Sequence, residues 1–275
     1  MKRISDLMLG QIDMQLTDRD RRLVVAIRDF RFMKTNQVQR LYFPALIKTP
    51  RAALTATTRT MNRLRRLGLI DHLEKRIGGV RGGSQGLIWF VTEAGHRLLQ
   101  MGTPLEGKRK RTLEPSPLFL RHILAVTECC IQITEICRSE KEMDLIRIVI
   151  EPECWRSYEH GGKSISLRPD LYAETTSGEY RDYWFVEMDL ATESMNDILE
   201  KCKRYHEYRQ TEMEQKANEV FPVVLFIVPD EIRKQKIKEA IRETFKGRLT
   251  KIFLVITPQE LHRTMRDGAE AGDLC

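Results

Sequence analysis

The stretch TPRAALTATTRTMNRLRRLG, residues 49–68, decides the fold of the first part of the chain, because it predicts a long helix with two different faces. Proline at the first turn of a helix loses no hydrogen bond, and glycine suits a helix end, so we expect a helix from Thr49-Pro50 to Gly68. Counted at about 100° per residue, one sector should face a core: Leu54, Thr57, Met61 and Leu64. The opposite sector should stay at the surface: Thr55, Arg59, Asn62, Arg63 and Arg66.

Two shorter helices are expected before this stretch and a β-hairpin after it. Residues 17–30 combine a capping sequence with apolar residues at helical spacing, and a second short helix begins at Thr35 and stops at Pro44. Residues 68–73 and 87–91 are typical of strands, and the glycine-rich residues 78–86 of the turn between them. Three helices followed by a hairpin predict a winged helix-turn-helix domain over residues 1–102.

The basic sector and the hairpin tip favour contact with DNA. Arginine and asparagine can make paired hydrogen bonds to base edges in the major groove, and a basic wing can contact the sugar-phosphate backbone. A solvated basic face and a protein-binding winged helix remain the alternatives. The candidate DNA-binding residues are Arg51, Thr55, Arg59, Asn62, Arg63, Arg66, Lys75, Arg76 and Arg81.

The distribution of charge supports the same partner. Residues 1–112 contain 23 Lys or Arg and 9 Asp or Glu, a net charge of +14, whereas the rest of the chain contains 23 and 30, a net charge of −7. A basic module therefore precedes an acidic one. Neutralisation of phosphates supplies most nonspecific affinity for nucleic acid, so double-stranded DNA is the expected partner of the first module.

Cysteine spacing and hydropathy exclude several classes of protein. The six cysteines form no C-x-x-C pair and the histidines no H-E-x-x-H motif, so we expect buried reduced thiols and no zinc. No apolar stretch approaches the length of a membrane span, and the first ten residues do not resemble a signal peptide. A cytoplasmic location without a membrane partner is expected.

A second domain is expected after a linker. Residues 103–117 are rich in proline and charge and lack periodicity, which is typical of a linker. Residues 118–265 then predict a helix to about Arg138, strands at 145–150, 164–174 and 181–189, a helix from Thr192 or Ser194 to about Lys216, a strand at 222–228, a helix at 230–245 and a strand at 252–256. Residues 266–275 are expected to be a disordered tail.

That order resembles the core of the PD-(D/E)XK nuclease-like fold, so the fold class expected for the whole chain is α/β, or α+β overall. Arg168-Pro169-Asp170 would lie on the second strand and Glu187-Met188-Asp189 would end the third. Because side chains alternate along a strand, Glu187 and Asp189 should share a face that Asp170 could join. Asp170 and Glu187 are the candidate metal ligands, with Mg²⁺ or Mn²⁺ as the cofactor, if the site is catalytic.

One position departs from the nuclease pattern. Asp189 stands where the resemblance implies a lysine, and Lys201 on the following helix could replace that cation, with Tyr205 beside it one turn further on. The candidate catalytic residues are therefore Asp170, Glu187, Asp189 and Lys201. The alternative assigns these carboxylates to a turn cap and an edge-strand charge, and Lys201 to a solvated helix.

Taken together, the winged helix, the basic linker, R-P-D, W-F-V-E-M-D and the basic-aromatic helix of residues 201–208 resemble the replication-relaxation family of bacterial plasmids and mobile elements. The resemblance implies a role in plasmid replication initiation, or in DNA relaxation and mobilisation during conjugation. It also implies replication or mobilisation proteins as partners. No histidine cluster accompanies a nucleophilic tyrosine, so nicking through a phosphotyrosine is not expected.

Three functions follow as hypotheses. The first is a sequence-specific DNA-binding protein of a plasmid or integrative element. The second is a metal-dependent DNA nuclease that uses the second domain. The third is a transcriptional repressor in which an inactive second domain serves for dimerisation, which would make the protein a homodimer.

Overall fold

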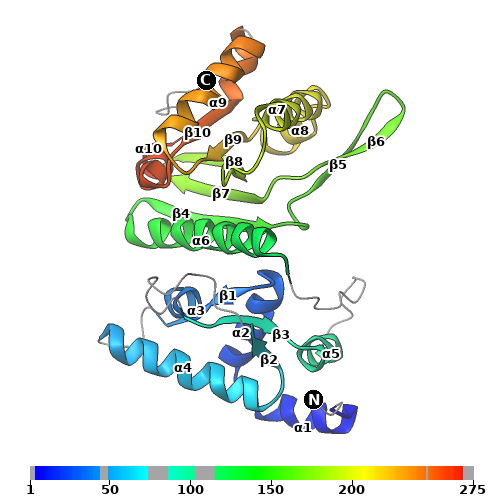
Figure 1. Cartoon of the computed structure of the whole chain (residues 1–275), viewed down its shortest axis with the longest axis vertical. Coiled ribbons are helices and arrows are strands. Elements are labelled where there is room, and N and C mark those ends of the chain that lie inside the picture. The colour runs from blue at the N-terminus through cyan, green and yellow to red at the C-terminus, as the bar shows by residue number, and fades with distance from the viewer. Residues whose placement is uncertain (1–3, 44–48, 74–85, 103–114, 246, 269–275) are drawn as a thin grey trace. The chain divides into compact units, whose positions relative to one another are not determined.

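The computed structural model describes residues 4–43, 49–73, 86–102, 115–245 and 247–268 (Figure 1). Within these ranges it contains ten α-helices and three β-sheets, so the expected mixed α/β class is confirmed. The chain divides into two compact units, the N-terminal unit Met1–Ile131 and the C-terminal unit Gln132–Cys275. This division falls inside helix α6 (Pro117–Ser139). Of the linker predicted at 103–117, residues 103–114 lie outside the described ranges, so the domain boundary stays a prediction.

The N-terminal unit consists of helices packed around a small antiparallel sheet. Its strands are ordered β1-β3-β2, so the first strand pairs with the last. The elements are α1 (Asp6–Gln15), α2 (Asp18–Asp29), β1 (Met33–Lys34), α3 (Thr35–Tyr42), α4 (Pro50–Arg66), β2 (Ile70–His72), β3 (Ile88–Val91), α5 (Glu93–Gly102) and the first part of α6. The three helices and two strands predicted from the sequence are present, whereas α1 and β1 were not predicted.

Local sequence explains where the helices of this unit begin. A capping box opens α2: the Thr17 hydroxyl accepts a hydrogen bond from the Asp20 backbone N–H, and the Asp20 carboxylate accepts one from the Thr17 backbone N–H. Helix α4 begins as predicted, with Pro50 in its first turn. The Thr49 hydroxyl caps it by accepting a hydrogen bond from the Ala52 backbone N–H at 3.3 Å.

Helix α4 packs on the core through a face slightly different from the predicted one. Thr57, Met61 and Leu64 are fully buried, as predicted. The prediction for Leu54 is wrong, because its side chain is 46% exposed and Ala53 takes the buried position in that turn. Positions 53, 57, 61 and 64 lie on one stripe, and position 54 falls just beyond its edge, where no core element covers it.

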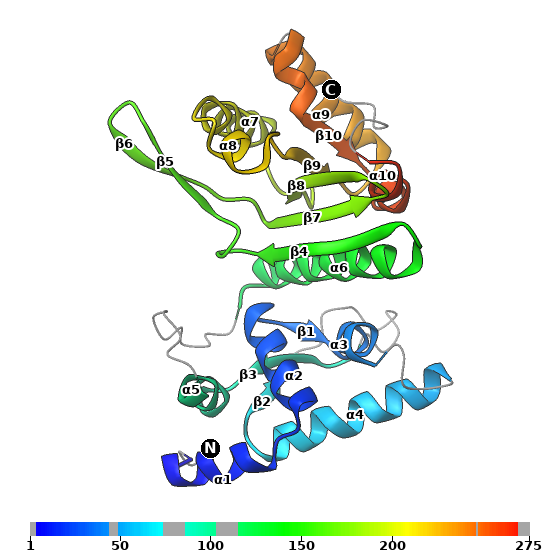
Figure 2. The same ribbon diagram turned by 180° about the vertical axis from the view of Figure 1, so that it is seen from behind.

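The C-terminal unit is built on a mixed five-stranded sheet with strand order β10-β9-β8-β7-β4. Strands β4, β7 and β8 are antiparallel neighbours, and β9 and β10 run parallel to β8. A separate hairpin, β5–β6, extends from the sheet (Figures 1 and 2). The elements after α6 are β4 (Met143–Ile150), β5 (Arg156–His160), β6 (Lys163–Leu167), β7 (Leu171–Ser177), β8 (Tyr180–Met188), α7 (Met195–Gln210), α8 (Met213–Asn218), β9 (Val223–Ile227), α9 (Glu231–Thr244), β10 (Phe253–Ile256) and α10 (Leu261–Asp267).

The structure corrects two of the predicted elements in this unit. The strand predicted at 164–174 is two strands, because Arg168-Pro169-Asp170 separates β6 from β7 and proline cannot donate a hydrogen bond to a sheet. Asp170 therefore precedes the second strand of the sheet instead of lying on it. The long helix predicted to Lys216 ends at Gln210, and Glu212, with φ +56°, separates it from α8.

Residues at the chain's end and two short elements were not predicted correctly. Strand β5 and helix α10 have no counterpart in the prediction, and α10 reaches Asp267, so the first two residues of the expected disordered tail are helical. Residues 269–275 lie outside the described ranges. The five described cysteines are buried thiols, as predicted: Cys129, Cys130, Cys137, Cys154 and Cys202. Over the described residues, no helix combines the length and apolarity required to span a membrane.

The core of the C-terminal unit lies between the sheet and helices α7 and α9. Phe185 of β8 packs among Ile198 and Tyr205 of α7, and Ile237 of α9 belongs to the same buried cluster. Because side chains alternate along a strand, Glu187 points toward the same two helices as Phe185. This placement brings a carboxylate into an otherwise apolar layer.

Candidate functional site

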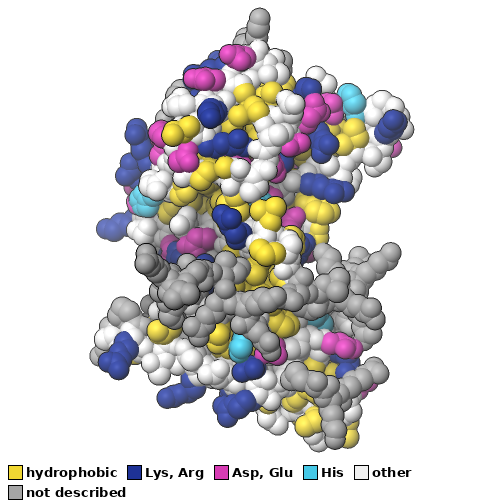
Figure 3. Space-filling model, viewed as in Figure 1, with side chains coloured by type: hydrophobic (Ala, Val, Ile, Leu, Met, Phe, Trp, Pro, Cys, Tyr) yellow, Lys and Arg dark blue, Asp and Glu magenta, His cyan; other side chains and the backbone are white. Residues whose placement is uncertain are grey.

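The outer face of α4 carries the candidate DNA-binding residues of the N-terminal unit that fall within the described ranges. We use this name for five exposed side chains: Arg51, Thr55, Arg59, Asn62 and Arg66. Figure 3 shows basic side chains spread along the α4 surface of this unit. Arg51 and Arg59 have no ion-pair partner among the described residues, so both guanidinium groups are available to an external anion.

Arg63, which was also predicted to contact DNA, is held within the protein. Its guanidinium forms an ion pair with Asp20 of α2, whose side chain is almost fully buried. Burial by itself raises the pKa of Asp20, but the hydrogen bond from the Thr17 hydroxyl and the contact with Arg63 outweigh it and hold the pKa below its usual value. The geometry makes Arg63 a residue that positions α4 against α2.

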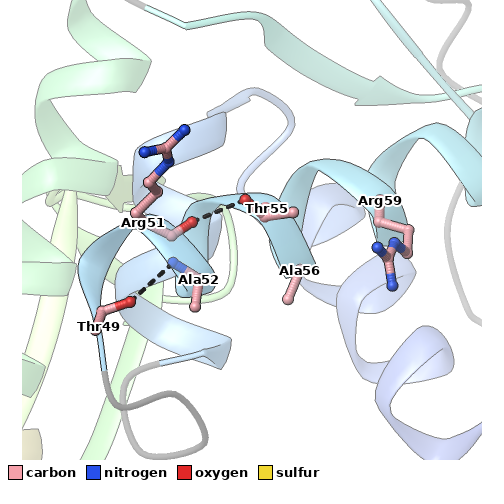
Figure 4. Close-up of a pocket in the computed structure, with 6 residues that line it drawn as sticks. All are labelled: Thr49, Arg51, Ala52, Thr55, Ala56 and Arg59. Atoms are coloured by element: carbon pink, nitrogen blue, oxygen red, sulfur yellow. Dashed lines mark hydrogen bonds between the residues drawn. The ribbon is translucent and has the colours of Figure 1, made fainter.

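A shallow hollow lies on the first half of α4. It is lined by Thr49, Arg51, Ala52, Thr55, Ala56 and Arg59 (Figure 4). The hollow is open to solvent along the helix, so it is shaped to receive a convex edge and does not enclose a small molecule. It coincides with the part of the outer face that carries Arg51 and Arg59.

The remaining predicted DNA contacts fall between β2 and β3 in the sequence. Lys75, Arg76 and Arg81 lie outside the described residues. Arg65 donates a hydrogen bond to Asp71 of β2 at 2.8 Å, so this arginine of α4 is used within the protein. The structure therefore separates the basic residues of α4 into paired ones, Arg63 and Arg65, and unpaired ones.

A second group of charged residues gathers where β8 ends, in the C-terminal unit. Glu187 is 3% exposed, and its two carboxylate oxygens have separate partners on α7. Lys201 Nζ donates to Glu187 Oε2 at 2.9 Å, and the Tyr205 hydroxyl donates to Glu187 Oε1 at 2.6 Å. Lys201 also donates to Glu193 at 2.9 Å. The sequence placed Lys201 near this site, and the structure brings it to Glu187.

Asp189 has a different partner, although it lies on the same side of the strand. Arg233 of α9 donates to Asp189 Oδ2 at 2.6 Å, and the Ala191 backbone N–H donates to Asp189 Oδ1 at 2.9 Å. The same arginine donates to the Glu193 carbonyl at 2.8 Å. Asp189 occupies the position that holds a lysine in the nuclease pattern. Here it forms an ion pair with Arg233, and this pair fixes α9 to the end of β8.

Asp170 lies close to Glu187 but is bound by backbone. Its carboxylate accepts a hydrogen bond from the Met188 N–H at 2.7 Å, and its own N–H donates to the Val186 carbonyl at 3.1 Å. The side chain is 7% exposed. We call these residues together the carboxylate cluster: Asp170, Glu187, Asp189, Glu193, Lys201, Tyr205 and Arg233.

Burial and charge act in opposite directions within the carboxylate cluster. Burial raises the pKa of Glu187 to about 7, although the charge of Lys201 acts to lower it. Burial also tends to lower the pKa of Lys201, but the negative charges of Glu187, Asp170 and Glu193 raise it well above its usual value. The pKa of Tyr205 is raised, first by burial and then by Glu187. Lys201 is thus held in its charged form.

Asp170 and Glu187 are the two predicted metal ligands, and both lie in the carboxylate cluster. No group of three or more His, Cys, Asp or Glu side chains suited to a metal occurs in the described part of the chain, so Asp189 does not complete such a group. Mg²⁺ is commonly bound through one or two carboxylates together with waters and substrate phosphates. Two carboxylates beside a lysine fit that mode, whereas they do not form a closed protein site.

The sequence analysis missed three residues: Glu193 and Arg233 of the carboxylate cluster, and Asp20, which binds Arg63 of α4. Glu193 lies in the loop before α7, and Arg233 lies on α9. Neither has a spacing in the sequence that connects it to Glu187. Asp20 was visible only as part of a helix cap. No local spacing connects Arg63 with Asp20 or Arg233 with Asp189, so the sequence carried no signal for these two ion pairs.

The fold and these two sites define a mixed α/β protein whose N-terminal unit exposes a basic helix face and whose C-terminal unit encloses a carboxylate cluster. A family model described as Replication-relaxation matches residues 25–224, from α2 to β9 and across both units. The chain belongs to the replication-relaxation family. No curated protein matches it. Among solved structures, none matches either.

Proposed function

We propose that this protein is a sequence-specific double-stranded DNA-binding protein of a plasmid or integrative element, acting in replication initiation or in DNA relaxation and mobilisation. The replication-relaxation family supports the connection with replication. The element order α2-β1-α3-α4-β2-β3, with β1 paired to β3, supports a winged helix-turn-helix assignment for the N-terminal unit. In that assignment α4 is the recognition helix.

The observation that carries the proposal is the state of the arginines on α4. Arg63 and Arg65 are paired with acidic residues of the same unit, whereas Arg51 and Arg59 lie exposed on the outer face without an ion-pair partner among the described residues. The net charge of residues 1–112 is +14. A helix that keeps unpaired guanidinium groups on one face of a strongly basic module is suited to a polyanion with base edges.

The test is DNA binding measured with a site selected from random duplexes. Arg59→Ala should weaken binding to the selected site about 10- to 100-fold and relax the preference for it over unrelated DNA. Affinity should fall steeply with salt concentration. Arg65→Ala is the matched control on the same helix, because its guanidinium already pairs with Asp71. Binding that does not depend on salt, or that responds equally to both substitutions, would contradict the proposal.

A second candidate function is a metal-dependent nuclease, and the contact between Lys201 and Glu187 favours it. The strand order and directions of β4, β7, β8 and β9, with α7 between β8 and β9, support the PD-(D/E)XK nuclease-like assignment. Asp170 and Glu187 would hold a Mg²⁺ or Mn²⁺ ion. Asp189 occupies the lysine position of the nuclease pattern, and Lys201 would supply the positive charge of that lysine. The metal would lower the pKa of an attacking water.

Plasmid cleavage in the presence of Mg²⁺ or Mn²⁺ tests this second candidate. Cleavage should be lost in Asp170→Ala and in Lys201→Met, and Glu174→Ala, on the same sheet but outside the carboxylate cluster, should cleave normally. Activity that survives Asp170→Ala would indicate a contaminant and reject the assignment. Calorimetric titration of the intact protein with Mn²⁺ gives a separate measure of metal binding.

A further inference from the structure

The floor of the hollow on α4 is apolar, although it lies in the middle of a basic face. Ala52 and Ala56 contribute methyl groups to it. The hydroxyl of Thr55 donates a hydrogen bond to the Arg51 carbonyl at 2.9 Å within the helix (Figure 4). Thr55 lines the hollow, and because that bond uses its hydroxyl proton, it has no free O–H donor to offer a base.

Two arginines border this apolar floor at different levels of the helix. Arg51 and Arg59 are eight residues apart, which corresponds to about 12 Å along the helix axis. Successive base pairs are about 3.4 Å apart, so this separation is comparable with roughly three to four base-pair steps. Ala52, Thr55 and Ala56 lie between the two arginines on the helix.

Each of these surfaces matches a different group in the major groove. Arginine makes its commonest specific contact with guanine, through O6 and N7, and small apolar side chains contact the 5-methyl group of thymine. Thymine is the only one of the four common bases with a methyl group in that groove. A floor of methyl groups would gain nothing from the bare polar edge of a cytosine or an adenine.

We propose that the hollow of α4 recognises thymine 5-methyl groups in a short element bordered by guanines, with Ala52, Thr55 and Ala56 contacting the methyl groups and Arg51 and Arg59 the guanines. This inference rests on the proposed DNA-binding function and names its target. If both arginines instead contact phosphates, the hollow faces the backbone and thymine methyl groups do not affect affinity. The experiment separates these two arrangements.

The first measurement replaces thymine with deoxyuridine, which lacks the 5-methyl group and keeps the same hydrogen-bonding edge. Sites selected from random duplexes should share a thymine with a guanine within about four base pairs. Replacing that thymine should weaken binding by about three- to fivefold, the effect of removing one buried methyl group. The same replacement outside the shared element should leave the affinity unchanged.

The second measurement removes the methyl group from the protein. Thr55→Ser keeps the hydroxyl and deletes the methyl group in the hollow, and Thr58→Ser deletes the same group from an exposed position of α4 outside the hollow. Thr55→Ser should reduce the discrimination between thymine and deoxyuridine about threefold, whereas Thr58→Ser should retain it. Circular dichroism checks that both variants fold alike.

The outcomes distinguish this inference from the proposed function. Selective, salt-dependent binding to sites without thymine, or with no response to deoxyuridine, would overturn the methyl-recognition inference and leave DNA binding intact. An equal response of Thr55→Ser and Thr58→Ser would also overturn it. Absence of any selected site would instead reject the proposed function itself.

Discussion

The outer face of α4 and the carboxylate cluster use similar side chains in opposite ways. On α4, Arg51 and Arg59 remain exposed without an ion-pair partner among the described residues. In the cluster, Lys201 and Arg233 are bound to Glu187 and Asp189, whose carboxylates are at most 4% exposed. Charges of the first kind contribute little to folding and are free to bind a partner. Those of the second kind are needed by the fold, because a buried charge without its partner is strongly unfavourable.

The difference also indicates which of the two sites can accept substitutions without loss of the fold. A substitution on the outer face of α4 changes what the helix contacts and leaves the core as it is. A substitution in the cluster affects the attachment of α7 and α9 to β8, since both helices are tied to that strand through Lys201, Tyr205 and Arg233. Stability measurements should therefore separate the two regions clearly.

The largest effect is expected for Lys201→Ala, which leaves Glu187 buried without its cation. We expect the free energy of unfolding of the C-terminal unit to fall by about 3 kcal/mol. Lys203→Ala, on the same helix but in an exposed pair with Glu200, should change it by no more than about 0.5 kcal/mol. Urea denaturation combined with hydrogen exchange of β8 peptides measures both variants. Equal effects would show that the Lys201 pair is not important for the fold.

A double substitution sharpens that result. Lys201→Met together with Glu187→Gln removes both charges, so it should be less destabilising than Lys201→Ala alone. A double variant that is more unstable than the single one would show that Glu187 stabilises the unit through Tyr205 and not through the ion pair.

A smaller effect is expected for Arg63→Ala in the N-terminal unit. Asp20 would lose one partner but keep the hydrogen bonds from Thr17, so the free energy of unfolding should fall by about 1–2 kcal/mol. Arg66→Ala, on the exposed face of the same helix, is the control and should be nearly neutral. Thermal or urea unfolding followed at Trp89, which is buried in this unit, reports the change. If Arg63→Ala is also neutral, Arg63 belongs with the outer face.

The same pair predicts a pH dependence. The pKa of Asp20 lies below its usual value in the folded protein, so its stabilising effect is complete above that usual value and is lost as the pH falls through the lower, folded value. The difference in unfolding free energy between wild type and Asp20→Asn should therefore shrink as the pH is lowered from 6 toward 3. A difference that stays constant over this range would mean that Asp20 does not depend on its charge.

The smallest change in stability is expected for the double variant Arg51→Ala and Arg59→Ala. Both side chains are exposed, so the free energy of unfolding should change by no more than about 0.5 kcal/mol, even though affinity for selected DNA should fall strongly. Unfolding and binding measured on one preparation test this directly. A loss of stability comparable with that of Arg63→Ala would remove the distinction between the two kinds of arginine.

Sequence reasoning succeeded where the signal is local. The beginning and end of α4 follow from Thr49, Pro50 and Gly68. Strand β8 and the carboxylates at its end follow from a run of hydrophobic residues and from the alternation of side chains along a strand. It failed where the signal is a backbone break. Pro169 divides one predicted strand into two. Glu212 adopts a positive φ between two helices, and the presence of a glutamate does not predict that conformation.

The sequence by itself determined that the chain has a basic N-terminal part with a two-faced helix, followed by an acidic α/β part with clustered carboxylates, because periodicity and composition are properties of neighbouring residues. The tertiary structure alone decided which charges are free. Arg59 and Arg63 are four residues apart on one helix and look equivalent in the sequence, yet Arg63 meets Asp20, 43 positions earlier in the numbering, and Arg59 meets no acidic partner in the described part of the chain. An ion pair depends on distance in space, and the folding of distant segments sets that distance.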